Sequence, residues 1–211
     1  MNLEEDIDDF IICPIRNQTE SERLFLTHYI SSLELEGYKV YWPFRDTNQQ
    51  DNIGLNICYQ NRNAIKKAKR VRVYFTSKSE GTLFDIGMSF MARKPIIVIN
   101  HKELEFKKDK DEFKDFILKY AINTNFYGTS EFYNKVLKRR EEIKELKIIE
   151  YEWKGNTREF LFDFGMTFMA GKEIILKNRD DVRKSITPYK SFQNLLFTLD
   201  SLNRIKRKIK S

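Results

Sequence analysis

The chain alternates between short apolar runs, which suit buried strands, and longer stretches in which apolar residues recur at helical spacing. The first apolar run covers residues 10–15. Thr19 and Glu22 follow with the spacing of a capping box, in which a hydroxyl and a carboxylate satisfy free N–H groups at a helix start, and Gly37 is placed to end this helix. The apolar side of this helix is predicted to comprise Leu24, Phe25, His28, Ile30, Leu33 and Leu35.

The rest of the chain continues this alternation. Pro43 closes the second predicted strand, and a loop is expected over 44–52. Strand–helix alternation at this spacing predicts an α/β fold, with a Rossmann-like (flavodoxin-like) parallel sheet and helices on both faces. The further predicted strands are 38–42, 71–75, 96–99 and 148–153, and the further helices are 53–69, 83–91, 112–121, 130–145 and 191–208.

One segment occurs twice. Residues 83–100 read LFDIGMSFMARKPIIVIN and residues 161–178 read LFDFGMTFMAGKEIILKN, with twelve of eighteen positions identical at a constant offset of 78. The match extends backwards, since Ile65-Lys66 aligns with Ile143-Lys144. The fold is therefore predicted to be partially duplicated, with a first half over 1–105 and a second half over 106–211 that contains the repeat and a C-terminal helix. A packed pseudo-dimer and one continuous sheet are both compatible with this pattern.

Composition narrows the classes of protein. At 41% hydrophobic and 14% aromatic residues, the chain can bury a core, which argues against disorder. No apolar run approaches the roughly 20 residues needed to span a bilayer. The first ten residues, MNLEEDIDDF, lack the pattern of a secretion signal, so a cytoplasmic location is expected. Cys13 and Cys58 lie in apolar stretches and are predicted to be reduced, buried thiols.

The net charge of +7 favours ligands that carry phosphate. Much of the excess lies in a C-terminal cluster, which is either a phosphate or nucleic-acid contact or the solvated end of a helix. The second interpretation is favoured because no basic stripe with interleaved aromatics continues upstream, so nucleic acid is not expected as a partner. The cluster comprises Arg204, Lys206, Arg207, Lys208 and Lys210.

In open α/β sheets, ligands bind beyond the carboxyl ends of the strands. Four segments are predicted to meet there: 13–17, 44–49, 76–82 and 100–101. Their arginines, lysine, carboxylates, hydroxyls and amides suit a sugar phosphate or a nucleotide. The chain has no Walker A loop, G-x-G-x-x-G, C-x-x-C or H-E-x-x-H motif, so no cofactor and no metal are expected. Of its histidines, His28 is predicted to be a core or boundary residue of the first helix.

Asp85 has two interpretations. The stretch 82–85 has capping-box spacing, with Thr82 as the cap and Asp85 favourable to the helix dipole. Alternatively, Asp85 is a carboxylate held at a helix start, facing the cleft as a nucleophile or as a ligand to a sugar hydroxyl. The second copy keeps Asp163 but has Phe160 in place of Thr82, so Asp163 is predicted to be structural. The sequence thus predicts one working site and one structural copy.

The run FIICPI, together with NRNAIKKAKRVRVYFTSKSEGTLFDIGMSFMARKPIIVIN, resembles the nucleoside 2-deoxyribosyltransferase family and the related nucleotide N-glycosidases. The resemblance covers about residues 10–100. Members of this family break N-glycosidic bonds with a glutamate nucleophile and pass the sugar to another base or to water. The family's three acidic positions fall here on Asn61, Ser79 and Asp85, and Glu80 lies beside Ser79.

The resemblance implies a transferase or hydrolase that acts on a nucleoside or nucleotide, with Asp85 as the nucleophile and Glu80 in base recognition or proton transfer. Relatives complete their sites across a subunit interface, so a homodimer is expected, with the duplicate half standing in for a partner. A non-catalytic nucleotide sensor or sponge on the same fold, and a protein that serves assembly alone, are the alternatives. The implied ligand-binding residues are Pro14, Arg16, Arg45, Asp46, Asn61, Lys78, Ser79, Gly81 and Thr82.

Overall fold

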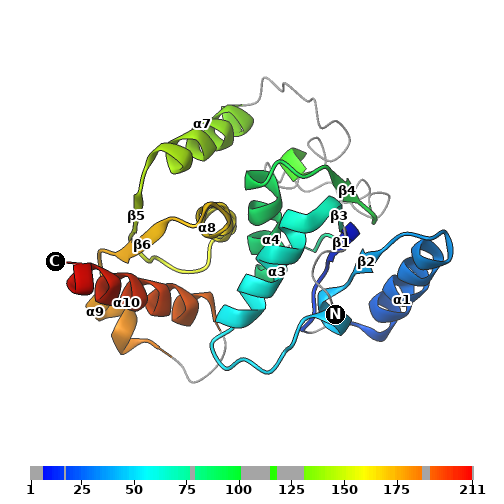
Figure 1. Ribbon diagram of the computed structural model, residues 1–211, viewed down its shortest axis with the longest axis horizontal. Coiled ribbons are helices and arrows are strands. Elements are labelled where there is room, and N and C mark those ends of the chain that lie inside the picture. Colours follow the sequence, from blue (N-terminus) through cyan, green and yellow to red (C-terminus); the bar gives the residue numbers. More distant parts are fainter. Residues whose placement is uncertain are drawn as a thin grey trace.

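The computed structural model describes residues 7–16, 18–76, 79–100, 115–117, 131–186 and 191–210 (Figure 1). The helix predicted at 112–121 lies outside these residues except for 115–117, which are helical. The boundary predicted between the two halves also lies outside them.

The elements follow the predicted order. The second half has α7 (Glu131–Glu145), β5 (Ile148–Tyr151), α8 (Arg158–Ala170), β6 (Glu173–Leu176), α9 (Arg179–Lys184) and α10 (Phe192–Lys210). The short helices α2 (Pro43–Asp46) and α9 were not predicted. Pro43 begins α2 instead of only closing a strand, because its fixed φ suits the first helical position. The first half has β1 (Ile7–Ile12), α1 (Glu20–Leu35), β2 (Val40–Tyr41), α2 (Pro43–Asp46), α3 (Leu55–Lys67), β3 (Ala68–Val73), α4 (Glu80–Met91) and β4 (Ile96–Val98). Strands β1 and β3 each begin three residues earlier than predicted, and β2, β4 and β5 are shorter than predicted.

The first half is built on a parallel sheet with the strand order β2-β1-β3-β4, which confirms the predicted α/β class. Successive side chains of β1 point to opposite faces. Phe10 and Ile12 join the core cluster that contains residues of α3 and α4, whereas Ile11 packs with Leu26 and Ile30 of α1. Helices therefore cover both faces of this sheet (Figure 1).

Helix α1 begins with the predicted capping box. The N–H of Glu22 donates to Thr19 Oγ1 at 3.2 Å, and the N–H of Thr19 donates to Glu22 Oε2 at 2.8 Å. The predicted apolar side was wrong in part, because Leu24, Phe25, Leu35 and His28 are exposed. Only Leu26, Ile30 and Leu33 are buried, since a single strip of the helix contacts the sheet.

The repeated helices α4 and α8 cross in close contact. A Cβ built on Gly87 would lie 2.1 Å from the carbonyl oxygen of Phe162, and one built on Gly165 would lie 2.1 Å from that of Phe84. The same reciprocity occurs in ring contacts, with Arg62 over Phe168 at 5.6 Å and Arg140 over Phe90 at 4.9 Å. In each pair of contacts, the second contact joins the residues that correspond, at the offset of 78, to the two residues of the first. One core cluster consequently contains residues of both halves.

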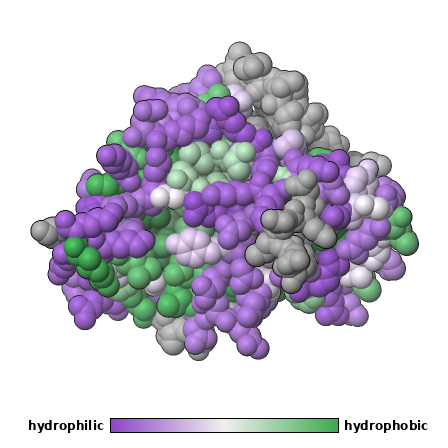
Figure 2. Space-filling model, viewed as in Figure 1, coloured by the Kyte–Doolittle hydropathy of each residue, from purple (hydrophilic) through white to green (hydrophobic). Residues whose placement is uncertain are grey.

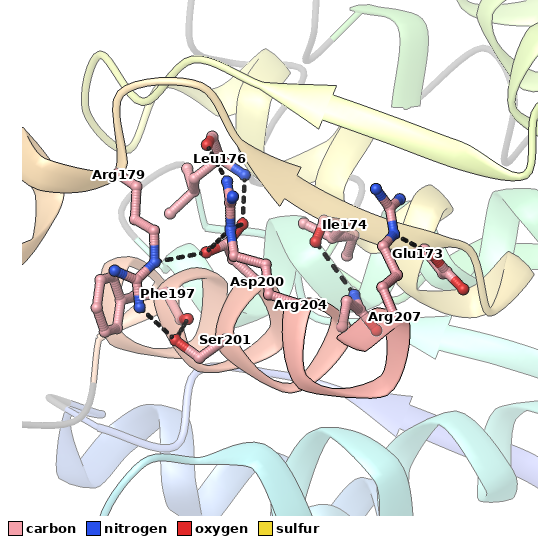
Figure 3. A network of polar contacts seen from close by, with 10 residues as sticks. Glu173, Ile174, Leu176, Arg179, Phe197, Asp200, Ser201, Arg204 and Arg207 are labelled. Carbon is pink, nitrogen blue, oxygen red and sulfur yellow. Dashed lines mark hydrogen bonds and ion pairs between the residues drawn. The ribbon is translucent and has the colours of Figure 1, made fainter. Parts of the chain in front are cut away.

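In the second half, the described strands β5 and β6 form a two-stranded parallel sheet, and α10 covers the outer edge of β6 (Figure 3). The N–H of Leu176 donates to Asp200 Oδ1 at 2.9 Å, and the carbonyl of Leu176 accepts from Arg204 Nη2 at 3.0 Å. Asn203 donates to the carbonyl of Ile174 at 3.1 Å. Side chains of a helix therefore satisfy backbone groups that a neighbouring strand would otherwise satisfy.

The same network explains part of the basic C-terminal cluster. The buried carboxylate of Asp200 accepts from Arg179 and Arg204, each at 2.9 Å, and Arg207 donates to Glu173 at 2.9 Å. These arginines hold α10 on the sheet. The surface nearby is partly apolar: Figure 2 shows a mostly hydrophilic face with hydrophobic side chains gathered over α10 near the C-terminus, where Ile205 is 56% exposed.

Candidate functional site

The predicted loops converge at the carboxyl edge of the four-stranded sheet. The side chain of Asn100, after β4, accepts from the N–H of Phe75 at 2.9 Å and donates to its carbonyl at 3.0 Å, which joins the loops after β3 and β4. The indole of Trp42 donates to the thiol sulfur of Cys13 at 3.4 Å, which joins the loops after β1 and β2. Strand β2 lies on one side of β1, and β3 and β4 lie on the other side. The strand order therefore reverses between β1 and β3, and this edge contains the topological switch point.

Asp85 lies in α4, partly exposed, and is oriented by side chains from three segments. Asn61 of α3 donates through Nδ2 to Asp85 Oδ2 at 3.2 Å. Thr47 donates to Asn61 Oδ1 at 2.9 Å, and the hydroxyls of Tyr41 and Thr47 lie 2.9 Å apart. Because Oδ1 of Asn61 is already occupied by Thr47, the amide presents its N–H groups to the carboxylate. The chain of contacts fixes one carboxylate oxygen.

The surroundings of Asp85 oppose its ionisation. Burial raises the pKa of Asp85 to about 7, and the hydrogen bond from Asn61 only partly offsets this. None of the described arginines or lysines forms an ion pair with this carboxylate. Burial, with a smaller contribution from the charge of Asp85, likewise raises the pKa of the Cys13 thiol to about 11. Both cysteines are free and buried, as predicted.

The equivalent aspartate in the second half has a different environment. Arg139 of α7 donates through Nε to Asp163 Oδ2 at 2.6 Å and through Nη2 to Oδ1 at 3.3 Å. The hydroxyl of Tyr151 also donates to Asp163 and lies 2.7 Å from the hydroxyl of Thr167. Arg139 occupies the position that corresponds to Asn61 at the offset of 78. The second copy therefore neutralises its carboxylate with an arginine, whereas the first gives it only an amide.

The helix caps correct one prediction. Thr82 is not the cap of α4, because the helix begins at Glu80 and the hydroxyl of Ser79 accepts from the N–H of Thr82 at 3.3 Å. The second copy has not lost its cap either: Thr157, at the position corresponding to Ser79, accepts from the N–H of Phe160 at 3.2 Å. Thr82 is buried, and its hydroxyl has no hydrogen-bond partner within the described residues.

Glu80 does not join Asp85. It is exposed and accepts a hydrogen bond of 2.7 Å from Asn156 of the second half. Five residues along a helix rotate the side-chain direction by about 140° net, so the two carboxylates leave α4 on different sides. The structure supports a contact between the halves at Glu80 and gives no support to proton transfer there.

Arg45 and Asp46 form an ion pair with each other. Arg45 donates to Asp46 Oδ1 and to Glu34 Oε1, both at 2.8 Å, and Asp46 Oδ2 accepts from the N–H of Trp42 at 2.8 Å. These contacts hold α2 against the end of α1. A structural role thus accounts for both residues.

The remaining predicted ligand-binding residues differ in how far they are exposed to solvent. Pro14 is buried and Arg16 is exposed after β1, and Lys78 lies outside the described residues. Gly81 is exposed, and a Cβ at this position would have nothing within 4 Å, so no close backbone approach requires glycine there. Sequence reasoning missed Gln18, whose two polar side-chain atoms are buried without a partner in the described part of the chain.

Sequence reasoning also missed the role of Thr47, which lay in a loop with several other polar residues. The contrast between Asn61 and Arg139 could have been found, because it follows from extending the alignment of the two copies by four residues. Within the described ranges, no group of three or more His, Cys, Asp or Glu side chains could hold a metal ion. No helix among the described residues is long and apolar enough to cross a bilayer.

Comparisons with protein families, with curated proteins and with solved structures give no match to this chain.

Proposed function

We propose that the chain binds a nucleoside or nucleotide at the carboxyl edge of the β2-β1-β3-β4 sheet and cleaves or transfers at its N-glycosidic bond. The strand order supports a Rossmann-like fold, because it equals the first four positions of the flavodoxin-like order, whose ligands bind at the switch point. The reciprocal contacts of α4 and α8 support a partial duplication. The resemblance of residues 10–100 supplies the reaction class.

The observation that carries the proposal is the difference between the two aspartates. Asp163 is bound by Arg139, whereas Asp85 is held by Asn61 and has no cationic partner among the described residues. An unneutralised, oriented carboxylate can act on an electrophilic carbon. A charge-paired carboxylate is a poor nucleophile, which leaves Asp163 a structural role.

In the proposed reaction, an oxygen of Asp85 bonds to the anomeric carbon of the sugar as the carbon–nitrogen bond breaks. The base leaves with the bonding electron pair and takes a proton from solvent. Water or a second base then displaces the Asp85 oxygen and completes hydrolysis or transfer. The carboxylate also stabilises the positive charge that develops on the sugar in an oxocarbenium-like transition state.

The test is release of free base from a panel of nucleosides, nucleotides and NAD, followed by chromatography. Asp85→Asn is expected to lower the rate by about a thousandfold or more, as expected for loss of a nucleophile. Asp163→Asn is the matched control and should retain activity. Because Asp85 must be ionised, the rate should rise with pH to a plateau above its pKa of about 7. Equal rates for wild type and Asp85→Asn would refute the assignment of the nucleophile.

A second function, nucleotide binding without turnover, is favoured by one observation. With a pKa of about 7, Asp85 is largely protonated just below neutral pH, and a neutral carboxyl can donate a hydrogen bond to a ligand. This function predicts that nucleotides raise the melting temperature without releasing base. A ligand at 100 times its Kd should stabilise the protein by about 2.7 kcal/mol. No shift with any compound would leave assembly as the remaining function.

In this proposal the second half takes the place of a partner subunit, in a protein of the cytoplasm. The largest assembly that we expect is a homodimer. Light scattering of the purified protein checks this, and a hexamer would contradict it.

A further inference from the structure

A second concave site lies away from Asp85. A groove of about 430 Å³ opens where α4 and α8 end. Four lysines line it, namely Lys66, Lys94, Lys144 and Lys172, with Met91 and Met169 among the apolar residues between them. Each lining residue of the first half corresponds to the lining residue 78 positions later in the second half. The groove therefore lies between equivalent surfaces of the two halves. Its volume falls in the range of small-ligand sites.

The groove is at the opposite edge of the sheet from the candidate site. Lys66 is near the end of α3, just before β3, and Lys94 comes just before β4. Both positions are at the amino ends of parallel strands, whereas Asp85 faces the carboxyl ends. Asp85 and Met91 are separated by six residues of α4, or about 9 Å along the helix axis. A ligand in the groove would therefore not occupy the proposed nucleoside site.

Two of the lysines are held in place by backbone carbonyls. Lys94 Nζ donates to the carbonyls of Lys66 and Ala68 at 2.8 and 2.6 Å, and Lys172 Nζ donates to the carbonyl of Lys144 at 2.6 Å. These contacts cap the last turns of α3 and α7. An ammonium has three N–H donors, so each has capacity beyond the carbonyls it binds among the described residues. The two cations are fixed before any ligand arrives.

The other two lysines are not explained by capping. Lys66 makes no ion pair with any acidic residue in the described ranges, and it is repelled by Arg62; burial and this repulsion lower its pKa. Lys144 Nζ donates to both carboxylate oxygens of Glu141, at 2.6 and 2.8 Å. No acidic residue of the described chain lines the groove itself. A concave surface lined by four lysines and no carboxylate, with only Lys144 paired to an acidic residue of the described part of the chain beside the groove, is favourable to an anion.

From this arrangement we infer that the groove binds a multivalent anion of the polyphosphate class. The two lysine pairs belong to opposite halves, so an anion with charge at both ends would contact both pairs. A singly charged ion would engage one pair and gain less. Such a ligand would also join the two halves, because Lys66 and Lys94 belong to one and Lys144 and Lys172 to the other.

The experiment titrates the full-length protein with inorganic tripolyphosphate by calorimetry at constant ionic strength. The groove variant is Lys66→Gln with Lys144→Gln, since Lys94 and Lys172 support the fold through their backbone contacts. The control is Lys206→Gln with Lys210→Gln, which removes the same charge from α10. Wild type and control should bind alike, and the groove variant should bind at least about tenfold more weakly.

Two results would overturn the inference. An equal loss in both double variants would mean that tripolyphosphate senses only net charge. Absence of binding to wild type would exclude a polyphosphate site. A separate measurement tests whether the groove variant is folded: its circular dichroism spectrum and its melting temperature should match those of wild type. If this variant unfolds, Lys66→Gln alone replaces it, with Lys206→Gln as its control, and should still weaken binding by severalfold.

Discussion

Asp85 and Asp163 show how one residue type acquires opposite properties from its neighbours. Both lie in the same position of repeated helices. Asn61 donates a single neutral hydrogen bond to Asp85, while Arg139 and Tyr151 both donate to Asp163. A carboxylate that is largely removed from water and has no counter-ion is destabilised relative to its protonated form, and only Asp163 has an arginine as counter-ion among the described residues. The two aspartates should therefore respond oppositely to the same substitution.

Asp85→Asn is expected to stabilise the protein at alkaline pH. The folded-state pKa of about 7 lies above the ordinary value of 3.8, so the folded state holds its proton more tightly. The resulting stability is complete below about pH 4 and is lost as pH rises through about 7. At pH 8 the free energy of unfolding of the variant should exceed that of wild type by up to about 4 kcal/mol. This difference should become smaller as the pH falls. Urea unfolding at pH 5 and pH 8 measures it.

Asp163→Asn is the matched comparison. It removes the ionic partner of Arg139, so the free energy of unfolding should fall by about 1–3 kcal/mol at pH 7. A change of the same sign in both variants would contradict the different environments described for the two aspartates.

Arg93→Gly is expected to stabilise the protein by about 0.5–1 kcal/mol. Arg93 follows the C-cap of α4 and has a φ of 56°, in the left-handed region; the corresponding residue of the second copy is Gly171, with a φ of 69°. Glycine adopts this conformation without a Cβ clash. Chemical denaturation measures the gain. Arg93→Ala removes the same side chain but keeps the strain, so a gain of equal size in this variant would refute the explanation.

At this scale the sequence singled out Asp85 and the family resemblance singled out Asn61, and the structure joins the two by a hydrogen bond of 3.2 Å. Sequence reasoning failed at Glu80 because the helix was predicted to begin at residue 83, which placed Glu80 in the preceding loop, whereas α4 begins at Glu80. It failed at Arg45 and Asp46 because adjacent opposite charges in a loop do not reveal that they bind each other. Thr47 could not be found, since its role depends on the packing of α3 beside the loop.

At the scale of elements, the α4–α8 crossing depends on two glycines. Backbone carbonyls occupy the space where their Cβ atoms would lie. Unlike a flexible side chain, a helix backbone cannot move aside locally. Small residues at a helix contact allow this close approach.

Gly87→Ala is therefore expected to lower the free energy of unfolding by about 3 kcal/mol or more, as for an overpacked core. Gly165→Ala should cost a similar amount, because its contact is the reciprocal one. Gly81→Ala, in the same helix, has nothing within 4 Å of the added Cβ and should be neutral or slightly stabilising. Guanidinium unfolding of the three variants tests this, and equal effects at Gly81 and Gly87 would contradict it.

The order of strands and helices was largely predictable from periodicity, and element boundaries were not. The helix start at Ser79 was missed because two overlapping stretches, 79–82 and 82–85, both offer a hydroxyl three residues before a possible partner. The short helix α2 was missed because a proline after a strand is also typical of a turn. Capping depends on which backbone N–H groups are free, and this is known only once the helix is formed.

At the scale of the whole molecule, the two halves share one hydrophobic core. The sequence indicated a repeat, but not how its copies meet. The described strands lie in two separate sheets, of four and two strands, and the halves meet through α4 and α8. Repetition of a sequence carries no information on which surfaces face each other, so this could not be predicted.

A shared core predicts that both halves unfold in one cooperative transition. The chain has two tryptophans, Trp42 in the first half and Trp153 in the second. Replacing either with phenylalanine leaves a fluorescent probe in one half only. Each single-tryptophan variant should show one urea transition. Once the difference in overall stability between the two variants is subtracted, their curves of fraction unfolded against urea concentration should coincide. A separate transition for each probe would show that the halves are independent units.

The network of Asp200 has a consequence for folding in the cell. The outer edge of β6 is a row of backbone groups that could pair with a strand of another molecule, and α10 is what occupies it. The end of α10 lies 34 residues after Leu176 in the chain, so β6 can pair with β5 before α10 has docked on its outer edge. A chain in which α10 is not docked can pair with another molecule through this strand. Helix α10 thus protects the edge of β6 from pairing with a strand of another molecule.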